Sequence, residues 1–295
     1  MSQRPQNQNQ HDAHDQGPFA DLEKLQAAVL QRRRALGLLS SAGALALLGC
    51  GGGGSGSGSS SSISTSGGST GTGSTTSTSS CTLIPEETAG PYPGDGSNTA
   101  NGAIANALAL TGIVRSDIRS SVASASGMAA GVPLTMAIRM VNTNGSCADL
   151  SGYAIYLWHC DREGRYSMYS SGITSENYLR GVQMTGSDGI ATFTTIFPGC
   201  YDGRMPHMHF EIYRSTTTAG SYTNKLRTSQ IAFPTDICNT VYANASGYSA
   251  SVSNFARISF ATDNVFSDGV ATQLATLSGS VAQGYSGSLT VGIAV

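Results

Sequence analysis

Charge is scarce in this chain: Asp, Glu, Lys and Arg make up 12% of its 295 residues, and the formal net charge is −2. A nucleic-acid-binding surface needs an excess of Lys and Arg to neutralise phosphates, so the composition argues against that function class. Long apolar runs are also missing. The one run that could concern a membrane, Ala35–Gly49, has 15 residues, whereas a spanning helix needs about 20. Low charge together with 37 Gly favours an exported β protein with linkers over a helical bundle.

Residues 1–49 have the pattern of an export signal. Three consecutive arginines (32–34) precede the apolar stretch Ala35–Gly49, and a basic region before a short apolar stretch is typical of a secretory signal. Adjacent arginines point towards the twin-arginine route, and the choice between this route and general secretion stays open. Residues 47–50, Leu-Leu-Gly-Cys, resemble a bacterial lipobox, in which Cys50 is lipidated and becomes the new N-terminus. The alternative interpretation of this stretch is a buried helix of a globular domain.

A segment rich in Gly, Ser and Thr follows the predicted lipidation site. Of the 30 residues 51–80, 29 are Gly, Ser or Thr and none is charged. Such a segment buries too little apolar area to offset the entropy of ordering it, so we expect a flexible tether with a reach of roughly 30 Å. A lipid anchor at Cys50 followed by this tether predicts an extracytoplasmic protein whose folded domain comprises residues 81–295.

The remaining 215 residues alternate between apolar and polar side chains, which predicts one all-β domain with the architecture of a β-sandwich. One strand face would carry Leu134, Met136, Ile138 and Met140. The other predicted elements are strands at Tyr153–Trp158, Ala191–Phe197, Gln230–Phe233, Ala256–Ala261 and Ser288–Val295, and one modest helix near Thr235–Ala245. Asn-Gly and Asp-Gly pairs between these segments are turn signals.

Five cysteines follow Cys50, namely Cys81, Cys147, Cys160, Cys200 and Cys238. An exported protein favours disulfides, but an odd number leaves at least one thiol free or paired between molecules. The sequence does not choose among the possible pairings. No CxxC spacing is present, which argues against a zinc–thiolate site.

Histidine is scarce too: His11 and His14 lie in the predicted leader, which leaves His159, His207 and His209. The segment His207–Tyr213 alternates, so its two histidines project from the face opposite its apolar residues and can converge on one metal ion. Three other interpretations stay open. The pair could be half-exposed on a solvent face, or form a cupin-like site or a zinc hydrolase site with Glu211. The cupin pattern usually adds a later histidine, and none follows here.

Four sequence blocks surround this histidine pair. They are Pro85–Tyr92 (PEETAGPY), Gly164–Tyr166 (GRY), a Pro-Gly-x-Tyr turn at residues 198–201, and Arg-x-x-His-x-His at residues 204–209. In this order they resemble the intradiol ring-cleavage dioxygenases, a family of non-haem ferric enzymes, and in particular the core of the protocatechuate 3,4-dioxygenase type. The resemblance extends over most of Cys81–Phe233 and implies a β-sandwich.

The resemblance implies four ligands for ferric iron: Tyr166, Tyr201, His207 and His209. Two tyrosinates are hard anionic donors that favour ferric over ferrous iron, and imidazoles complete the set. Coordination to the ion itself deprotonates the phenols. By the same resemblance Tyr201 is the axial ligand that leaves when substrate binds, and His209 lies opposite it.

The resemblance also implies roles around the metal. Arg204 would contact the bound substrate, Gln230 would orient substrate or oxygen species, and Tyr92 would line the substrate cavity. His159 matches no family role and is interpreted as a satisfied strand residue.

The implied reaction uses O2 to open a catechol-type ring between its two hydroxyl-bearing carbons, which gives a muconate-type diacid. No nicotinamide or flavin is implied, in agreement with the lack of a GxGxxG motif after a strand. The identity of the catechol, and whether the chain forms a homo-oligomer, stay open. The alternative from another function class is a catalytically idle, extracytoplasmic binding module on the same sandwich.

Overall fold

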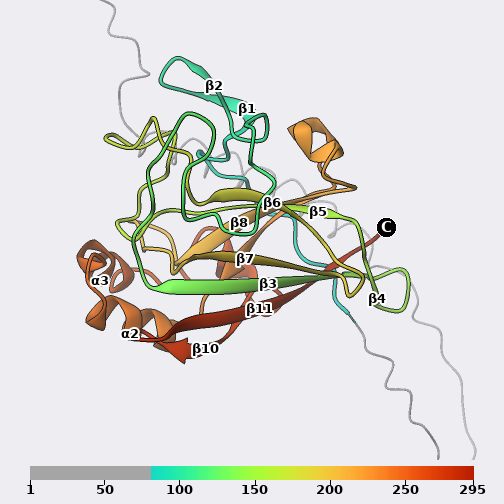
Figure 1. Ribbon diagram of the computed structural model, residues 1–295. Coiled ribbons are helices and arrows are strands. Elements are labelled where there is room, and N and C mark those ends of the chain that lie inside the picture. Colours follow the sequence, from blue (N-terminus) through green and yellow to red (C-terminus); the bar gives the residue numbers. More distant parts are fainter. Residues whose placement is uncertain (1–80) are drawn as a thin grey trace, which may run out of the picture. The chain divides into compact units, whose positions relative to one another are not determined.

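The structure, a computed structural model, describes residues 81–295. The predicted leader, the lipidation site at Cys50 and the tether lie outside the described residues. Within the described part, the chain consists mainly of strands, which form two larger sheets and one separate hairpin (Figure 1). No helix found in residues 81–295 is long and apolar enough to cross a membrane.

The first sheet contains strands from the middle and the end of the chain. Its members are β3 (Pro133–Asn142), β4 (Ala148–Asp149), β7 (Ile190–Ile196), β10 (Thr276–Ser280) and β11 (Gly284–Ile293). Strand β3 lies in the centre, parallel to β11 on one side and antiparallel to β7 and β4 on the other. The predicted buried face of β3 is confirmed, because its residues Leu134, Met136, Ile138 and Met140 are at most 1% exposed.

The second sheet is antiparallel throughout, with the strand order β6-β5-β8-β9. These strands are β5 (Ala154–Trp158), β6 (Arg180–Met184), β8 (His207–Tyr213) and β9 (Arg227–Ala232). All seven residues of β8 and all five of β5 are buried. Both faces of this sheet are therefore covered, one by the first sheet and the other by loops.

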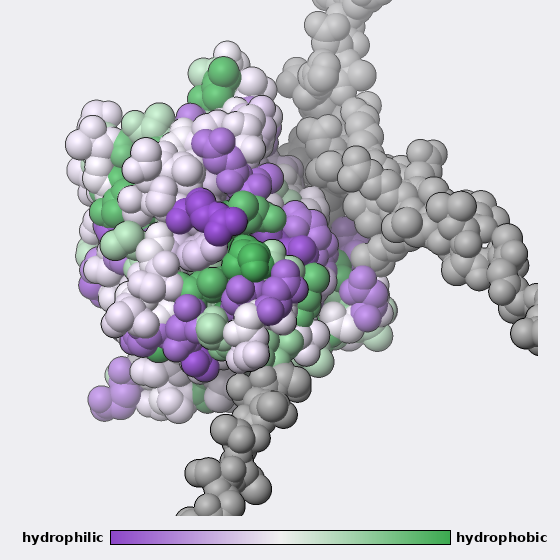
Figure 2. Space-filling model, turned by 90° about the vertical axis from the view of Figure 1, so that its right-hand side faces the viewer, coloured by the Kyte–Doolittle hydropathy of each residue, from purple (hydrophilic) through white to green (hydrophobic). Residues whose placement is uncertain are grey.

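The main hydrophobic core lies between the two sheets. It joins side chains such as Met136 and Phe193 of the first sheet to Ile155 and Phe210 of the second. The short elements are the hairpin strands β1 (Asp95–Ala100) and β2 (Ala103–Asn106), helices α2 (Thr235–Asn244) and α3 (Ser249–Phe255), and 3₁₀ turns at Thr218–Gly220, Tyr222–Asn224 and Phe266–Asp268. The two helices lie together at one end of the sandwich (Figure 1). On the face that Figure 2 presents, polar residues interrupt the apolar ones.

The predicted elements are confirmed, with one exception. Strands lie where alternation predicted them, and α2 covers the predicted helix. The strand predicted at Ala256–Ala261 is wrong, because this segment follows α3 as a series of turns. Ser259 accepts backbone N–H bonds from Thr262 and Asp263, which closes a turn in place of a sheet ladder. The alternation there reflects two partly buried anchors, Ile258 and Phe260, on a small separate core cluster.

The cysteines form a single disulfide in the described residues. It joins Cys81 to Cys147, 66 residues apart. The other three, Cys160, Cys200 and Cys238, are free and buried. Burial raises the pKa of these thiols, that of Cys200 to about 12.

Candidate metal centre

The four residues predicted as iron ligands converge at one end of the second sheet. His207 and His209 open β8, Tyr166 lies in the loop after β5, and Tyr201 lies in the turn before β8. His207 Nε2 lies 3.0 Å from His209 Nε2 and 3.1 Å from the Tyr201 hydroxyl. The rings of Tyr166 and Tyr201 are 5.8 Å apart between centroids. The polar atoms of His207, His209 and Tyr201 thus meet at one point, and the Tyr166 ring lies next to them, although residues 166 and 209 are 43 positions apart.

Strand β8 places both histidines as its alternation predicted. Met208, Phe210 and Ile212 belong to the core between the sheets, so the histidines point to the opposite face. That face is not open to solvent, because His207 and His209 are each 2% exposed. The interpretation of a half-exposed pair on a solvent face is therefore wrong: the loops that carry Tyr92, Tyr166 and Tyr201 cover it.

The His209 imidazole is held between two neighbours. The Trp158 ring stacks on it, with centroids 4.9 Å apart and planes inclined by 4°. At Gly90, whose φ is +69°, an added Cβ would lie 3.3 Å from His209 Cε1. A side chain at residue 90 would therefore press on the ring, and glycine also suits the left-handed backbone there.

The His207 ring is oriented by a hydrogen bond to its own loop. Its Nδ1 lies 2.6 Å from the Met205 carbonyl, which can only accept, so Nδ1 carries the proton. Nε2 is then left with a lone pair directed at the convergence point. An imidazole whose second nitrogen donates to a carbonyl is the usual arrangement of a metal-binding histidine.

Burial sets the protonation states of the four groups. It lowers the pKa of His207 and His209 well below the ordinary value, and the Arg204 charge adds to the effect, so both imidazoles are neutral donors. Burial also raises the pKa of Tyr166 and Tyr201, so both phenols keep their protons when no cation is near. The Tyr166 hydroxyl is buried and has no hydrogen-bond partner in the described residues.

This donor set fits a ferric ion. An orphaned buried hydroxyl costs free energy, and a cation at the convergence point would bind it as a phenolate next to two neutral nitrogens and a second phenolate. Among the His, Cys, Asp and Glu residues of 81–295 alone, no group of three is arranged to hold a metal. The fit therefore depends on the two tyrosines.

The alternatives that use Glu211 are not supported by its contacts. Glu211 lies on the same face of β8, but one of its carboxylate oxygens accepts from the Tyr213 hydroxyl at 2.6 Å and the other from Lys225 Nζ at 2.9 Å. These bonds direct the carboxylate away from the histidine pair. A cupin-like or zinc hydrolase site would need it as a third ligand.

Arg204 and Gln230 lie next to the four donors and contact each other. Arg204 is 5% exposed and donates from one terminal nitrogen to Gln230 Oε1 at 2.7 Å. Gln230 in turn donates from Nε2 to the Thr88 carbonyl at 2.9 Å. Arg204 Nε pairs with Asp263 Oδ2 at 3.0 Å. No sequence motif points to Asp263, because this partner lies 59 residues further along the chain.

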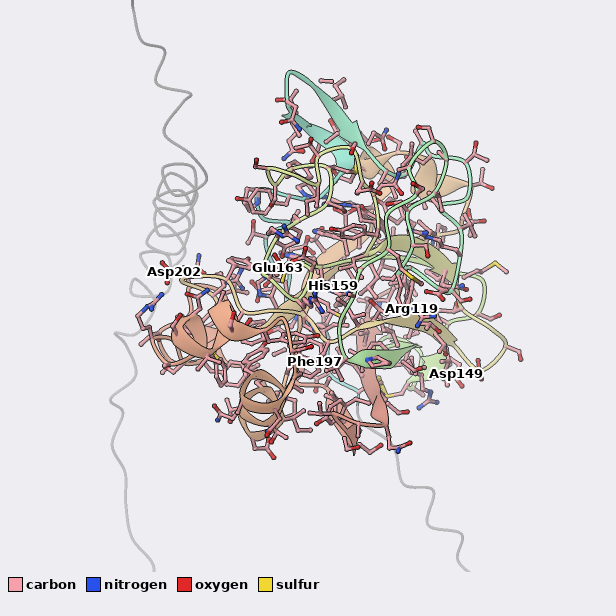
Figure 3. The ribbon with its side chains drawn as sticks, turned by 60° about the vertical axis from the view of Figure 1, so that its left-hand side comes forward. Arg119, Asp149, His159, Glu163, Phe197 and Asp202 are labelled. Atoms are coloured by element: carbon pink, nitrogen blue, oxygen red, sulfur yellow. A yellow bond between two sulfur atoms is a disulfide. The ribbon has the colours of Figure 1, made fainter. Side chains whose placement is uncertain are left out.

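Tyr92 lies next to one of the four donors, and His159 is a buried residue with both ring nitrogens bonded. The Tyr92 ring is partly exposed and packs on Tyr166, with centroids 4.9 Å apart. His159 is buried, with one ring nitrogen 2.8 Å from the Cys160 carbonyl and the other 2.7 Å from the Thr195 hydroxyl. Both of its nitrogens are thus satisfied away from the donors. In Figure 3, His159 lies inside the molecule, whereas Asp202 lies at its edge.

Comparisons with known proteins agree with this geometry. A family model described as Dioxygenase matches residues 114–243, a span that contains all four donors. An intradiol ring-cleavage dioxygenase from Tetranychus urticae has a similar structure, with a TM-score of 0.55 and 23% identity, over 72% of this chain and 95% of that one. The family model and this shared fold thus agree with the resemblance to the intradiol ring-cleavage dioxygenases that the four sequence blocks carry.

Other solved dioxygenase structures match over a similar length. A second dioxygenase structure is 25% identical, with a TM-score of 0.55, over 72% of this chain and 95% of that one. The dioxygenase domain of a dioxygenase–carbohydrate-binding fusion from Streptomyces sp. SirexAA-E is 23% identical, with a TM-score of 0.44, over 72% and 99%. No curated protein sequence matches the chain. Residues 81–295 therefore share an all-β sandwich fold with the two structures at a TM-score of 0.55.

Proposed function

We propose that this dioxygenase-family chain binds Fe(III) through Tyr166, Tyr201, His207 and His209. We further propose that it uses O2 to cleave a catechol-type ring between its two hydroxyl-bearing carbons, giving a muconate-type diacid. The observation that supports this most directly is the approach of His207 Nε2 to both His209 Nε2 and the Tyr201 hydroxyl, at 3.0 and 3.1 Å. Two neutral nitrogens and two phenols at one buried point suit a hard trivalent cation.

Bound ferric iron would supply Lewis acidity, drawing electron density from a ligated catecholate so that a ring carbon reacts with O2. The chain's own residues would hold and position the reactants. Tyr201 is only partly buried at its turn, and as a phenolate of the metal site its Oη could take a proton from the incoming catechol. Tyr92 would pack on the face of the substrate ring.

The positive charge of Arg204 would lie next to the reacting carbon in a fixed orientation. Its guanidinium is fixed on one side by Asp263 and on another by Gln230, which leaves little freedom of orientation. A preorganised cation of this kind stabilises negative charge that develops during a reaction, and it costs no reorganisation at that moment. The nearly complete burial of these groups excludes water and strengthens the interaction.

Metal content and the visible spectrum of the purified protein test the proposal. A ferric tyrosinate protein should contain about one iron per chain, have a red to purple colour and change its absorption when catechol is added. Oxygen uptake should accompany loss of the catechol and formation of a diacid. A colourless protein that binds iron no better than zinc would contradict the proposal and favour the idle binding module.

We also propose that the chain is exported and lipid-anchored at Cys50, on the order of basic, apolar and Gly/Ser/Thr-rich segments in residues 32–80. Expression of the full chain in a bacterium tests this. The wild type should fractionate with membranes, and Cys50→Ala should release it. A wild-type protein found free in the cytoplasm would contradict the proposal.

A further inference from the structure

Arg180 is a buried guanidinium whose partners lie on the site loops. It opens β6 and is 1% exposed. Its hydrogen bonds run from Nε to Ser167 Oγ (3.1 Å), from one terminal nitrogen to the Pro93 carbonyl (2.7 Å) and the Tyr156 hydroxyl (3.2 Å), and from the other to the carbonyls of Tyr92 (3.0 Å) and Ser167 (2.9 Å). All five N–H donors of the side chain are thereby used. The acceptors are carbonyl and hydroxyl oxygens, none of them a carboxylate.

These bonds join two segments that are more than 70 positions apart, residues 92–94 and 166–168. One terminal nitrogen of Arg180 binds the backbone of Tyr92 and the backbone of Ser167, the residue after Tyr166. Between these two backbones the rings of Tyr92 and Tyr166 pack with centroids 4.9 Å apart. The guanidinium therefore bridges the two backbone segments that carry the Tyr92 and Tyr166 rings.

The space for this guanidinium is shaped by its neighbours. At Gly94, where φ is +61°, an added Cβ would lie 2.7 Å from a terminal nitrogen of Arg180. The Tyr169 ring lies against the guanidinium, 5.3 Å from its central carbon. A glycine that leaves room and an aromatic ring that packs alongside fix the plane of the fork, and with it the direction of each bond.

We propose that Arg180 is a positioning residue that sets the separation of Tyr92 and Tyr166, and with it the aromatic wall that a catechol ring meets. The role of that wall in catechol binding rests on the proposed function. A planar fork can bind three carbonyls at once, whereas a lysine ammonium carries all its donors on one atom. Arg180→Lys therefore keeps the charge and loses the bridge between the two segments.

Arg115 offers a matched control. It also binds backbone carbonyls through its fork: Nε and one terminal nitrogen reach the Arg180 carbonyl at 3.2 and 2.7 Å, and the other terminal nitrogen reaches the Ser120 carbonyl. Its side chain makes no bond to residues 92–94 or 166–168. Arg115→Lys therefore removes a similar set of bonds while leaving intact the bridge between the segments that carry Tyr92 and Tyr166.

The test compares the two lysine variants in the iron-loaded protein. Both should lose thermal stability to a similar degree and keep their iron. Only Arg180→Lys should raise KM for catechol, by about tenfold or more and by a larger factor than it changes kcat, and shift the visible absorption band. If Arg180→Lys had the same KM for catechol and the same visible absorption band as Arg115→Lys, the proposal would be overturned.

Two further measurements keep the outcome decisive. If Arg180→Lys does not fold, Gly94→Ala displaces the fork instead, because the added Cβ would lie 2.7 Å from a terminal nitrogen of Arg180, and an unchanged KM in that variant would overturn the proposal. A crystal structure of Arg180→Lys or Gly94→Ala should show the Tyr92 and Tyr166 rings displaced from their 4.9 Å separation. The structural test stays valid even if the wild type cleaves no catechol. Lack of cleavage would reject the proposed function but not the role of Arg180. An unchanged separation would reject the role of Arg180.

Discussion

The two sheets of this sandwich differ in what their outer faces meet. In β3 of the first sheet, Leu134 and Met136 are buried while Thr135 and Arg139 are exposed, so one face meets the core and the other meets solvent. Strand β8 of the second sheet has the same alternation of apolar and polar residues, yet it is buried on both faces. Equal patterns in the sequence thus lead to unequal environments, because loops cover only the second sheet.

The covered face is where the protein buries polar groups. Burying a polar group without a partner costs roughly 1–3 kcal/mol, and this face contains His207, His209 and Glu211, all at most 2% exposed. The exposed face of the first sheet contains Ser and Thr that water can solvate. The core between the sheets is therefore the main source of stability, while the covered face holds the donors of the proposed metal site.

The largest expected effect comes from removing a donor on the covered face. Tyr166→Phe should abolish iron binding, colour and oxygen uptake with catechol. The iron-free variant should be as stable as the iron-free wild type or up to about 1 kcal/mol more stable, because the deleted hydroxyl has no partner. Iron analysis and urea unfolding measure both effects.

Tyr153→Phe is the control for this substitution. The Tyr153 hydroxyl accepts from Arg214, away from the donors, so this variant should lose some stability and keep its iron and colour. If Tyr166→Phe kept its iron and turnover, the covered face would be structural, and the contrast between the sheets would have no functional meaning.

The second largest effect concerns the disulfide, which ties the start of the described chain to the first sheet. Cys147 lies just before β4, and the bridge closes a loop of 66 residues. Replacing Cys81 and Cys147 together by Ser should lower the free energy of unfolding by about 2–4 kcal/mol, measured by urea unfolding. Iron content and absorption should stay unchanged. A loss of iron in a folded double variant would show that the two regions are coupled.

The third effect is a pH dependence from His159. Burial lowers its pKa to about 4, so the unfolded chain binds a proton there at a higher pH than the folded chain does. The contribution of His159 to the free energy of unfolding is fully present above the unfolded pKa of about 6.5. It is lost as pH falls towards 4, by about 3 kcal/mol in total. Urea unfolding of iron-loaded protein at pH 7 and pH 4.5 measures the slope. His159→Asn should flatten it, and an equal slope in both proteins would contradict the burial effect.

Period-2 alternation was enough to predict most of the sandwich. It located β3, β8 and the buried side of each, because an apolar residue at every second position has one good environment in a strand. It failed for β6 and β10. The first three residues of β6 (RGVQM) are buried in spite of the charged Arg180, and β10 (TLSGS) is a mostly exposed edge strand with almost no apolar signal.

The four donors could be predicted because they lie in short motifs, whereas the residues that hold them could not. Asp263 pairs with Arg204 across 59 positions, and Trp158 stacks on His209 only because β5 pairs with β8. In the sequence, Arg180 is a polar residue that belongs to no motif. Contacts of this kind arise from the topology of the sheet, which local patterns do not encode.

The smallest expected effect comes from two glycine substitutions, and it distinguishes backbone strain at the glycine from contact with the proposed metal ligand His209. Gly90 and Gly102 both have positive φ, +69° and +80°, so alanine at either position should cost about 1–2 kcal/mol of stability. At Gly102 an added Cβ meets nothing within 4 Å, whereas at Gly90 it would lie 3.3 Å from His209 Cε1. Gly90→Ala should therefore also weaken iron binding, and Gly102→Ala should not.

The chain's single tryptophan offers a direct readout for this pair of variants. Trp158 stacks on His209, so iron at the site should quench its fluorescence, and a titration with Fe(III) gives the affinity. A right-shifted titration for Gly90→Ala alone would show that residue 90 matters through the imidazole that it packs against. Equal affinities in the two alanine variants would mean that the loop over the second sheet yields to the methyl group, and that the covered face is held less tightly than its contacts indicate.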